Sequence, residues 1–382
     1  MIVVRKRVHL FVRAVFISSV IGGIFLSGSS YAKEFNESKK ISVEGGVTAV
    51  AQSTNDSSVD AELFASVDLA VTIPAGNGEW LVYIEGNSTP KTNGVSSVIG
   101  EANGDAGSAL NRDGKGRLQV SELHYTLPVK SGVLTAGLLD VTAILDTSDV
   151  ANDETSQFLN ASLVGNPTIE FPDYTLGFLY NTEFDEGKSL SLALTSSNGL
   201  GDNTNVSYSE LVDISENGKG VFAAAEILWP VSDLQLRVGV WVNTADHAKL
   251  SGTSGTTNNY GVYALVDGKV GAGQWSIRGG IANDKVSRAA NFISAAVQYP
   301  TPQLPSNATF GAGVTHTSIS DNGKGAQEDD SVQAEVYVRF DMSDSLSVTP
   351  SLQLIKNSDF DASGTNFDEN QTLFSVRLNY AF

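Results

Sequence analysis

Apolar and polar residues alternate with a period of two along much of this chain. In the segment 60–73 every odd position is apolar, while the even positions include Asp, Glu, Ser and Thr. The same alternation recurs at 234–243 and 332–341. Successive side chains of a β-strand point to opposite faces, so these segments are predicted to be strands with one apolar face.

Sixteen segments follow this pattern or a close variant of it. They lie near 40–51, 60–73, 79–86, 117–127, 131–141, 174–181, 188–196, 219–229, 234–243, 259–267, 274–283, 290–299, 308–318, 331–341, 345–356 and 370–382. Short connections such as 128–130 alternate with long ones such as 86–116 and 142–173. Short turns alternating with long loops around an even number of strands are typical of an outer-membrane barrel. The predicted fold is therefore all-β, a transmembrane antiparallel barrel of about 16 strands.

The last segment carries a strong local signal. Its even positions, from Phe374 to Phe382, form one apolar face that ends in an aromatic residue. A closed barrel pairs its last strand with its first, so that no unpaired edge faces lipid. Many outer-membrane proteins have a similar ending, through which their assembly machinery recognises them, and we expect that machinery to bind here.

The first 32 residues have the features of a secretory signal. Arg5, Lys6 and Arg7 form a basic start, the apolar run 14–26 is too short to span a bilayer, and the segment 30–32 is a small-x-small cleavage site. No later stretch reaches the 18 or so apolar residues of a membrane helix. We expect 1–32 to be cleaved, leaving 33–382 as a barrel in the outer membrane of a Gram-negative bacterium.

Composition excludes several classes of protein. A formal net charge of -19 and a pI near 4.5 argue against nucleic acid as a partner. Without cysteine there is no zinc–thiolate site or thiol nucleophile. Beyond the signal, His124, His247 and His316 lie in no motif of a Ser-His-carboxylate enzyme. We expect no enzyme activity, cofactor or resident metal.

The acidic segment 359–364 lacks the Glu that completes a calcium loop. We expect acidic surface loops of this kind to contact lipopolysaccharide phosphates through divalent ions.

If the apolar face meets lipid, the other face lines the interior. Five arginines are predicted to point inward, together with Trp241, Tyr263, Glu335 and Tyr337; the arginines are Arg117, Arg237, Arg278, Arg339 and Arg377. A guanidinium offers several donors in a planar fork, and aromatic rings offer flat faces for a sugar. The pore and substrate-binding residues are thus predicted to be Arg117, Arg237, Trp241, Arg278, Glu335, Tyr337, Arg339 and Arg377. Alternatively, the arginines only pair with inward carboxylates such as Glu335 and Glu226.

The insert 140–172 has little strand alternation and contains apolar residues that require burial. A loop of this kind after a middle strand is expected to fold inward and narrow the pore. Its polar residues would face the wall arginines and create a transverse field that sorts solutes. The predicted constriction residues are Asp140, Asp146, Asn152, Asp153, Glu154, Asn160 and Glu170.

Five short segments in and just before this insert together resemble the carbohydrate-selective porins (OprB-type). They are 137–140, 145–146, 151–154, 157–160 and 166–172. A second stretch, running from Glu335 and Tyr337 to Leu352, Gln353 and Asn357, is similar in order to a region near the C-terminus of that family. The resemblance implies a sixteen-stranded channel for monosaccharides and related solutes. Tyr299 to Phe310 and the pair Asn357-Ser358 depart from the family pattern.

The expected function is passive diffusion of small hydrophilic solutes, especially sugars, across the outer membrane. Two main alternatives remain: a general cation-preferring porin without a sugar site, and a secreted β-rich adhesin without a pore. An outer-membrane hydrolase is a third, weaker alternative. A homotrimer is expected by resemblance, because trimers are common among sixteen-stranded porins.

Overall fold

A computed structural model of the chain describes residues 40–185, 187–203, 205–215, 219–323, 329–358 and 370–382. The predicted signal segment 1–32 and the acidic segment 359–364 lie outside these residues. The strands are β1 (Ser42–Thr54), β2 (Glu62–Ala75), β3 (Gly78–Asn87), β4 (Leu118–Val129), β5 (Gly132–Leu139), β6 (Thr175–Asp185), β7 (Lys188–Ser196), β8 (Val221–Val231), β9 (Leu234–Ala248), β10 (Thr256–Val270), β11 (Gly273–Ala282), β12 (Ala289–Pro300), β13 (Thr309–Ile319), β14 (Ser331–Asp341), β15 (Leu346–Lys356) and β16 (Asn370–Ala381). The short helices are α3 (Val95–Val98), η1 (Gly100–Ala102), α4 (Ala161–Val164) and η2 (Tyr208–Glu210).

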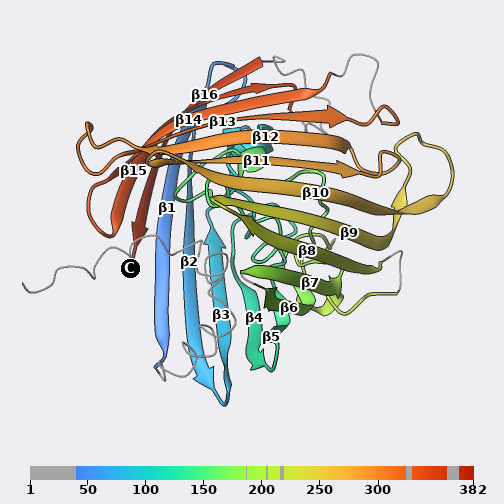
Figure 1. Ribbon diagram of the computed structural model, residues 1–382. Helices are drawn as coiled ribbons and strands as arrows, with labels where there is room; N and C mark the ends of the chain where they lie inside the picture. Colours follow the sequence, from blue (N-terminus) through green and yellow to red (C-terminus); the bar gives the residue numbers. More distant parts are fainter. Residues whose placement is uncertain (1–39, 186, 204, 216–218, 324–328, 359–369) are drawn as a thin grey trace, which may run out of the picture.

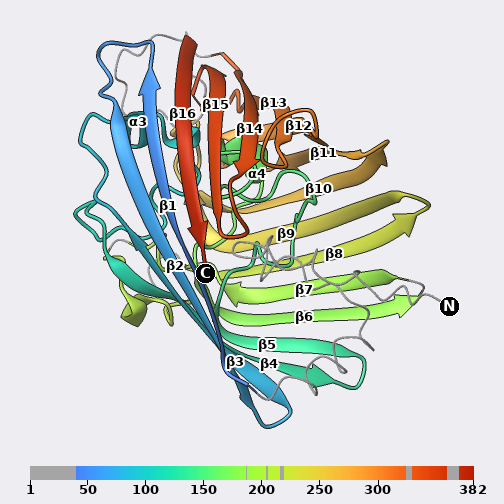
Figure 2. The same cartoon turned by 90° about the vertical axis from the view of Figure 1, so that its left-hand side faces the viewer.

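The strands close into an antiparallel barrel in which each pairs with its neighbours in sequence and β1 pairs with β16 (Figures 1 and 2). In the closing pair, Ala49 lies opposite Leu378. The pairing extends to the last residue, because Phe382 donates its N–H to the Gly45 carbonyl at 2.9 Å and accepts from the Gly45 N–H at 3.0 Å. Closure satisfies the strand edges that an open sheet would leave unpaired. The prediction of a sixteen-stranded barrel is confirmed.

The two faces of the barrel differ as the alternation predicted. Outward residues are apolar and exposed, such as Leu63 on β2 at 73% and Val240 on β9 at 52%. Inward residues are mostly polar and buried, such as Gln353 on β15 and Arg377 on β16, each at 0%. This is the reverse of a water-soluble protein, in which exposed positions are polar.

Pairing extends beyond the alternation at some strand ends. β9 and β10 remain paired as far as Ala248 and Thr256, although the apolar pattern predicted an end near Asn243. Backbone hydrogen bonds do not require apolar side chains, so a ladder continues where the alternation stops. In contrast, β5 ends at Leu139, where the chain turns into the barrel.

No helix in the described part of the chain is long and apolar enough to cross a membrane.

Candidate functional site

The β5–β6 connection, residues 140–174, folds into the barrel as predicted and is here called the inward loop. Its helix α4 begins at Asn160, whose side-chain oxygen accepts a hydrogen bond from the N–H of Ser162 and caps the first turn. The Asn160 amide also donates to Gln333 on β14 at 2.7 Å. The inward loop therefore reaches strands on the far side of the barrel.

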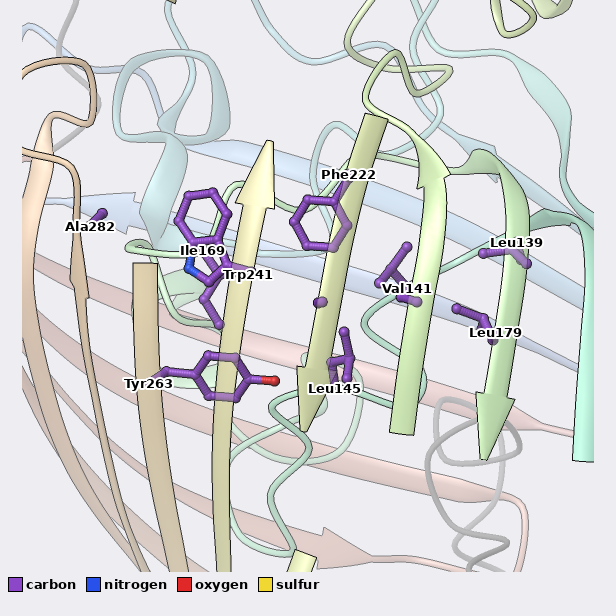
Figure 3. Packing of buried hydrophobic residues seen from close by; sticks show 11 residues of the cluster. Leu139, Val141, Leu145, Ile169, Leu179, Phe222, Trp241, Tyr263 and Ala282 are labelled. Atoms are coloured by element: carbon purple, nitrogen blue, oxygen red, sulfur yellow. The ribbon is translucent and has the colours of Figure 1, made fainter. Parts of the chain in front are cut away.

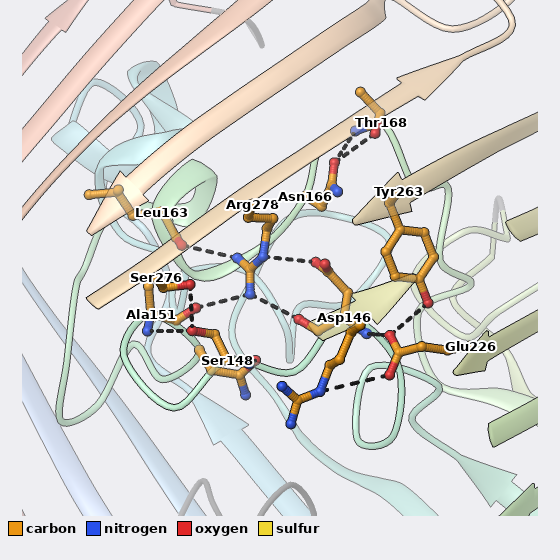
Figure 4. Close-up of polar contacts among 12 residues, drawn as sticks. Asp146, Ser148, Ala151, Leu163, Asn166, Thr168, Glu226, Tyr263, Ser276 and Arg278 are labelled. Carbon is orange, nitrogen blue, oxygen red and sulfur yellow. Dashed lines mark hydrogen bonds and ion pairs between the residues drawn. The ribbon is translucent and has the colours of Figure 1, made fainter. Parts of the chain in front are cut away.

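Arg278 on β11 holds three separate parts of this loop (Figure 4). Its Nη1 donates to the Leu163 carbonyl at 3.1 Å, and its Nη2 donates to the carbonyls of Asp146 and Ala151 at 2.9 and 3.0 Å. Its Nε lies 3.1 Å from the Asp146 carboxylate. A planar fork of donors suits this arrangement, which a single ammonium would not reproduce.

Two further arginines bind the next segment of the inward loop. Arg377 on β16 donates to the carbonyls of Glu154 and Gln157 at 2.6 and 2.9 Å. Arg339 on β14 donates to the Ser156 carbonyl at 3.2 Å and pairs with Asp341 at 3.0 Å. Arginines of the wall thus donate hydrogen bonds to main-chain oxygens of the loop.

Wall carboxylates bind the N–H groups of the same loop. Glu335 on β14 accepts from Leu159 at 3.1 Å and from Asn160 at 2.8 Å. Glu226 on β8 accepts from Asp146 at 2.7 Å. Donors and acceptors of the loop backbone therefore both find charged partners on the wall, and such charge-assisted bonds are stronger than neutral ones.

Arg237 on β9 pairs with carboxylates of the neighbouring wall strands. Its Nη1 is 3.1 Å from Asp267 on β10, and its Nε is 3.9 Å from Glu226. Asp267 in turn accepts from the Asp149 N–H at 3.2 Å. The alternative of pairing between inward arginines and carboxylates therefore applies to Arg237.

An apolar cluster inside the barrel packs the base of the loop against β6–β11 (Figure 3). Trp241 is 3% exposed and stacks on Phe222, with ring centroids 6.1 Å apart. Tyr337 is 2% exposed and meets Phe158 edge to face at 5.0 Å. Both rings are buried against the loop in this structure, and contact of either ring with a sugar stays a prediction.

The inward loop's own polar side chains mostly stabilise its turns. Asp140 accepts from Thr142, Asp153 from Thr155, and Asn152 from the Ser148 N–H. Glu170 contacts His247 on β9 and Asn259 on β10. Among the described residues, Asp146 is the loop carboxylate that pairs with a wall arginine. Backbone carbonyls bind most of the guanidinium groups, and the role of the loop carboxylates in sorting solutes stays a prediction.

Burial controls the charge of the loop carboxylates. It raises the pKa of Asp146 to about 7, although the Arg278 guanidinium opposes the rise. Burial, aided by the neighbouring Glu122, raises the pKa of Asp140 to about 6. The pKa of Glu154 is also raised by burial, with Asp153 adding to the effect. The loop is thus less negative near neutral pH than its composition suggests.

The β3–β4 connection, residues 88–117, also enters the barrel, which was not predicted from the sequence. The Ala102 carbonyl accepts from Gln52 on β1 at 3.0 Å and from Gln353 on β15 at 2.8 Å. The N–H of Gly104 donates to the Leu159 carbonyl of the inward loop at 2.8 Å. The available signal was the helical spacing of apolar residues, namely Val95, Val98, Ile99 and Ala102.

Three buried carboxylates of β2, β3 and the β3–β4 loop bond to uncharged groups. Asp68 on β2 accepts from Tyr83 at 2.8 Å, Glu85 on β3 from Ser121 at 2.5 Å, and Asp105 of the β3–β4 loop from Ser66 at 2.5 Å. These partners are neutral hydroxyl groups. Burial raises the pKa of Asp105 to about 6. The remaining predicted arginine, Arg117, donates to the Val206 carbonyl at 2.9 Å and so anchors the β7–β8 loop.

The eight wall residues predicted for the pore all lie on or beside inward strand positions. The structure brings Arg278, Glu335, Arg339 and Arg377 into contact with the inward loop. Contact of any of these groups with a passing solute stays a prediction.

Solved porin structures share this fold. The high-pH structure of Pseudomonas putida OprB has a TM-score of 0.70 and 13% sequence identity, covering 93% of this chain and 97% of that one. A mutant of the Rh. blastica porin scores 0.57 at 14% identity, covering 90% and 100%. The trimer form of Vibrio cholerae OmpT scores 0.56 at 12% identity, covering 90% and 99%. The resemblance to OprB-type porins is thus supported at the level of the fold.

Sequence comparison adds little beyond this. No family model matches the chain. An uncharacterized protein of Aquifex aeolicus (strain VF5) is 41% identical over 75 residues, which cover 20% of this chain and 24% of that protein. The match spans about a quarter of that relative's length.

Proposed function

We propose that residues 33–382 form a channel in the outer membrane of a Gram-negative bacterium, through which small hydrophilic solutes, monosaccharides among them, diffuse passively. One observation carries the proposal: a closed barrel exposes apolar residues outward and encloses polar residues and an inward loop. In hydrocarbon every backbone polar group must be bonded within the protein, and a closed barrel achieves this. A secreted adhesin would have no use for such an apolar outer face.

The sugar preference is supported by the chemistry of the interior. Among the arginines that bind the inward loop, Arg339 has a partly accessible side chain. Its side chain is 19% exposed, whereas that of Arg278 is 2% exposed. A guanidinium offers several donors in one plane, which is suited to the hydroxyl groups of a neutral solute. We therefore assign the sugar contact to Arg339.

Single-channel recording of the mature protein in a planar bilayer, with glucose titrated from micromolar to millimolar, tests the function. Stepwise openings that glucose blocks progressively would support a sugar channel. In Arg339→Ala the block should require about tenfold more glucose, because a hydrogen bond from a charged group is lost. Lys130→Ala, at an exposed turn, serves as the control. Openings indifferent to sugars would leave a channel without a sugar site, and no openings would remove the channel proposal.

Cation preference is a second candidate, favoured by one specific observation. The carboxylates of Glu85 and Asp105 have hydroxyl partners, whereas three wall arginines each lie within 3.1 Å of a carboxylate, namely Arg237, Arg278 and Arg339. The uncompensated charge of the interior is then negative, which attracts cations. Reversal potentials under a KCl gradient would measure this preference, and Glu85→Gln should reduce it.

We further propose a homotrimer, supported by the trimer form of OmpT among the similar folds. Light scattering of the detergent-solubilised protein, corrected for bound detergent, distinguishes one barrel from three. A mass of one chain would overturn this assignment without affecting the channel.

A further inference from the structure

The outgoing end of the inward loop is tied to the wall by a histidine. Glu170 lies 2.7 Å from Nε2 of His247, near the end of β9, and accepts from the Asn259 amide on β10 at 2.8 Å. On either side of Glu170, Ile169 and Phe171 pack into the interior apolar cluster. The segment 166–172 is here called the outgoing limb. It is held by the polar contacts of Glu170 and by the apolar packing of its two neighbours.

The geometry of His247 requires a charged ring. Its Nε2 faces the Glu170 carboxylate, and its Nδ1 lies 2.9 Å from the Ala245 carbonyl. An ionised carboxylate and a carbonyl oxygen can only accept, so each contact needs an N–H on the imidazole. A neutral ring has one N–H and can make one of the two bonds. Both bonds together exist only in the imidazolium form.

The charged groups around His247 favour this form. Glu170 of the inward loop carries the opposite charge, and Asp246 on the same strand accepts from the Thr256 hydroxyl at 3.0 Å. β10 contributes Thr257, opposite His247 in the ladder, and Asn259, neither of which titrates. The nearby β9–β10 connection begins with Lys249, whose charge opposes the effect. The direct contact with the Glu170 carboxylate at 2.7 Å dominates, because the Coulomb attraction between opposite charges is strongest at short range.

We propose that His247 is a pH-dependent positioning residue of the channel, which holds the outgoing limb against the wall while its ring is charged and loosens it as the ring loses its proton. The inference rests on the proposed channel function. An imidazole changes charge in the neutral pH range, unlike the other partners of this contact. Loss of the imidazolium removes one hydrogen bond and the charge assistance of the other. The loosened limb then moves into the lumen, so closures become more frequent as pH rises.

Single-channel recording between about pH 5.5 and about pH 8.5 tests the proposal. In the natural protein, the frequency of brief closures should rise about fivefold across this range, as expected when a charge-assisted bond is replaced by a neutral one. His247→Lys keeps a positive charge throughout, so closures should stay rare at every pH. His247→Gln never carries a charge, so closures should be frequent at every pH.

Two matched histidine variants complete the design. His316→Gln on β13, whose side chain is 46% exposed and lies 3.7 Å from Asp330, should leave the pH response unchanged. His124→Gln removes the histidine that lies 3.4 Å from Glu122, near the start of the inward loop. The pH response of the closures should also survive in His124→Gln. The proposal would be overturned if the response persisted in both His247 variants, or if His124→Gln abolished it while the His247 variants did not. Channels that open without any pH response would overturn it too, whereas absence of openings would instead defeat the channel function.

Discussion

The carboxylate of Glu335 accepts a hydrogen bond from the backbone N–H of Asn160 at 2.8 Å, although 175 positions separate the two residues. Its other oxygen accepts from the preceding N–H at 3.1 Å. Asn160 is also the N-cap of α4, so this contact fixes the helix on the β14 wall. A wall carboxylate that binds loop N–H groups, beside arginines that bind loop carbonyls, leaves the inward loop few alternative positions.

Removal of the Arg278 guanidinium should loosen the loop. Its three carbonyl partners and the Asp146 carboxylate would lose their donors inside the barrel. Breaking a buried pair by deleting one partner costs about 3–5 kcal/mol. We expect Arg278→Ala to lower the thermal midpoint and to raise single-channel conductance and noise. Lys130→Ala at an exposed turn is the control, and unchanged conductance with unchanged stability would contradict the anchoring role.

Gly280 on β11 is required by the close approach of the loop. A Cβ at this position would lie 2.0 Å from the Thr168 hydroxyl oxygen, which itself donates to Asn166 at 2.7 Å. Gly280→Ala should therefore displace the outgoing limb at a cost of about 1–3 kcal/mol and alter conductance. Its neighbour supplies the control, because a Cβ on Gly279 meets only the Phe292 carbonyl, at 3.2 Å.

A second-site change sharpens this experiment. Thr168→Ala removes the atom that the new methyl group would strike. The double variant should thus recover most of the natural conductance. If the double variant behaves like Gly280→Ala alone, the steric explanation fails.

The C-terminal Phe382 should matter more for assembly than for the finished barrel. Its backbone closes the β1–β16 pairing at Gly45, and its ring covers that glycine, where a Cβ would lie 2.7 Å from the ring. We expect Phe382→Ala to accumulate several-fold less in the outer membrane, while the purified chain refolds to the same strand content. Phe374→Ala, on the same face of β16, is the matched variant. Equal accumulation of both proteins, measured by quantitative immunoblotting, would refute a role for the terminal ring.

Asp173 at the end of the inward loop should make stability depend on pH. Burial raises the pKa of Asp173 to about 8, and Asp202 adds to the rise. In the unfolded chain an aspartate titrates near pH 3.9, so the folded state binds more protons between about pH 4 and about pH 8. This stabilising contribution is complete below about pH 4 and is lost as pH rises through about 8.

Asp173→Asn removes that titration while keeping a polar side chain. Urea unfolding of the refolded protein at about pH 5 and about pH 9 should show a smaller difference in midpoint than in the natural chain. Asp113→Asn, in an exposed part of the β3–β4 loop, should leave the difference intact. Equal pH dependence in Asp173→Asn and the natural chain would disprove the assignment.

The strands and the inner or outer phase of their residues were readable from the sequence, because alternation is a local property of an extended chain. For Arg377, the sequence predicts that the side chain points inward, because the residues on either side of it are apolar. Its partners do not follow, since the Glu154 carbonyl lies 223 positions away in sequence. Inward folding of the loop at 140–172 was also predictable, from its length and its apolar residues.

Tertiary structure alone decided what the inward residues touch. Trp241 has the phase of a lumen residue, yet the loop covers it, and the second inward loop at 88–117 carried only a weak helical signal. His247 and Glu170 meet because β9 lies beside the path of the outgoing limb. Alternation is set between neighbours on one strand, whereas these contacts exist only after sixteen strands close and bring distant segments to the same interior surface.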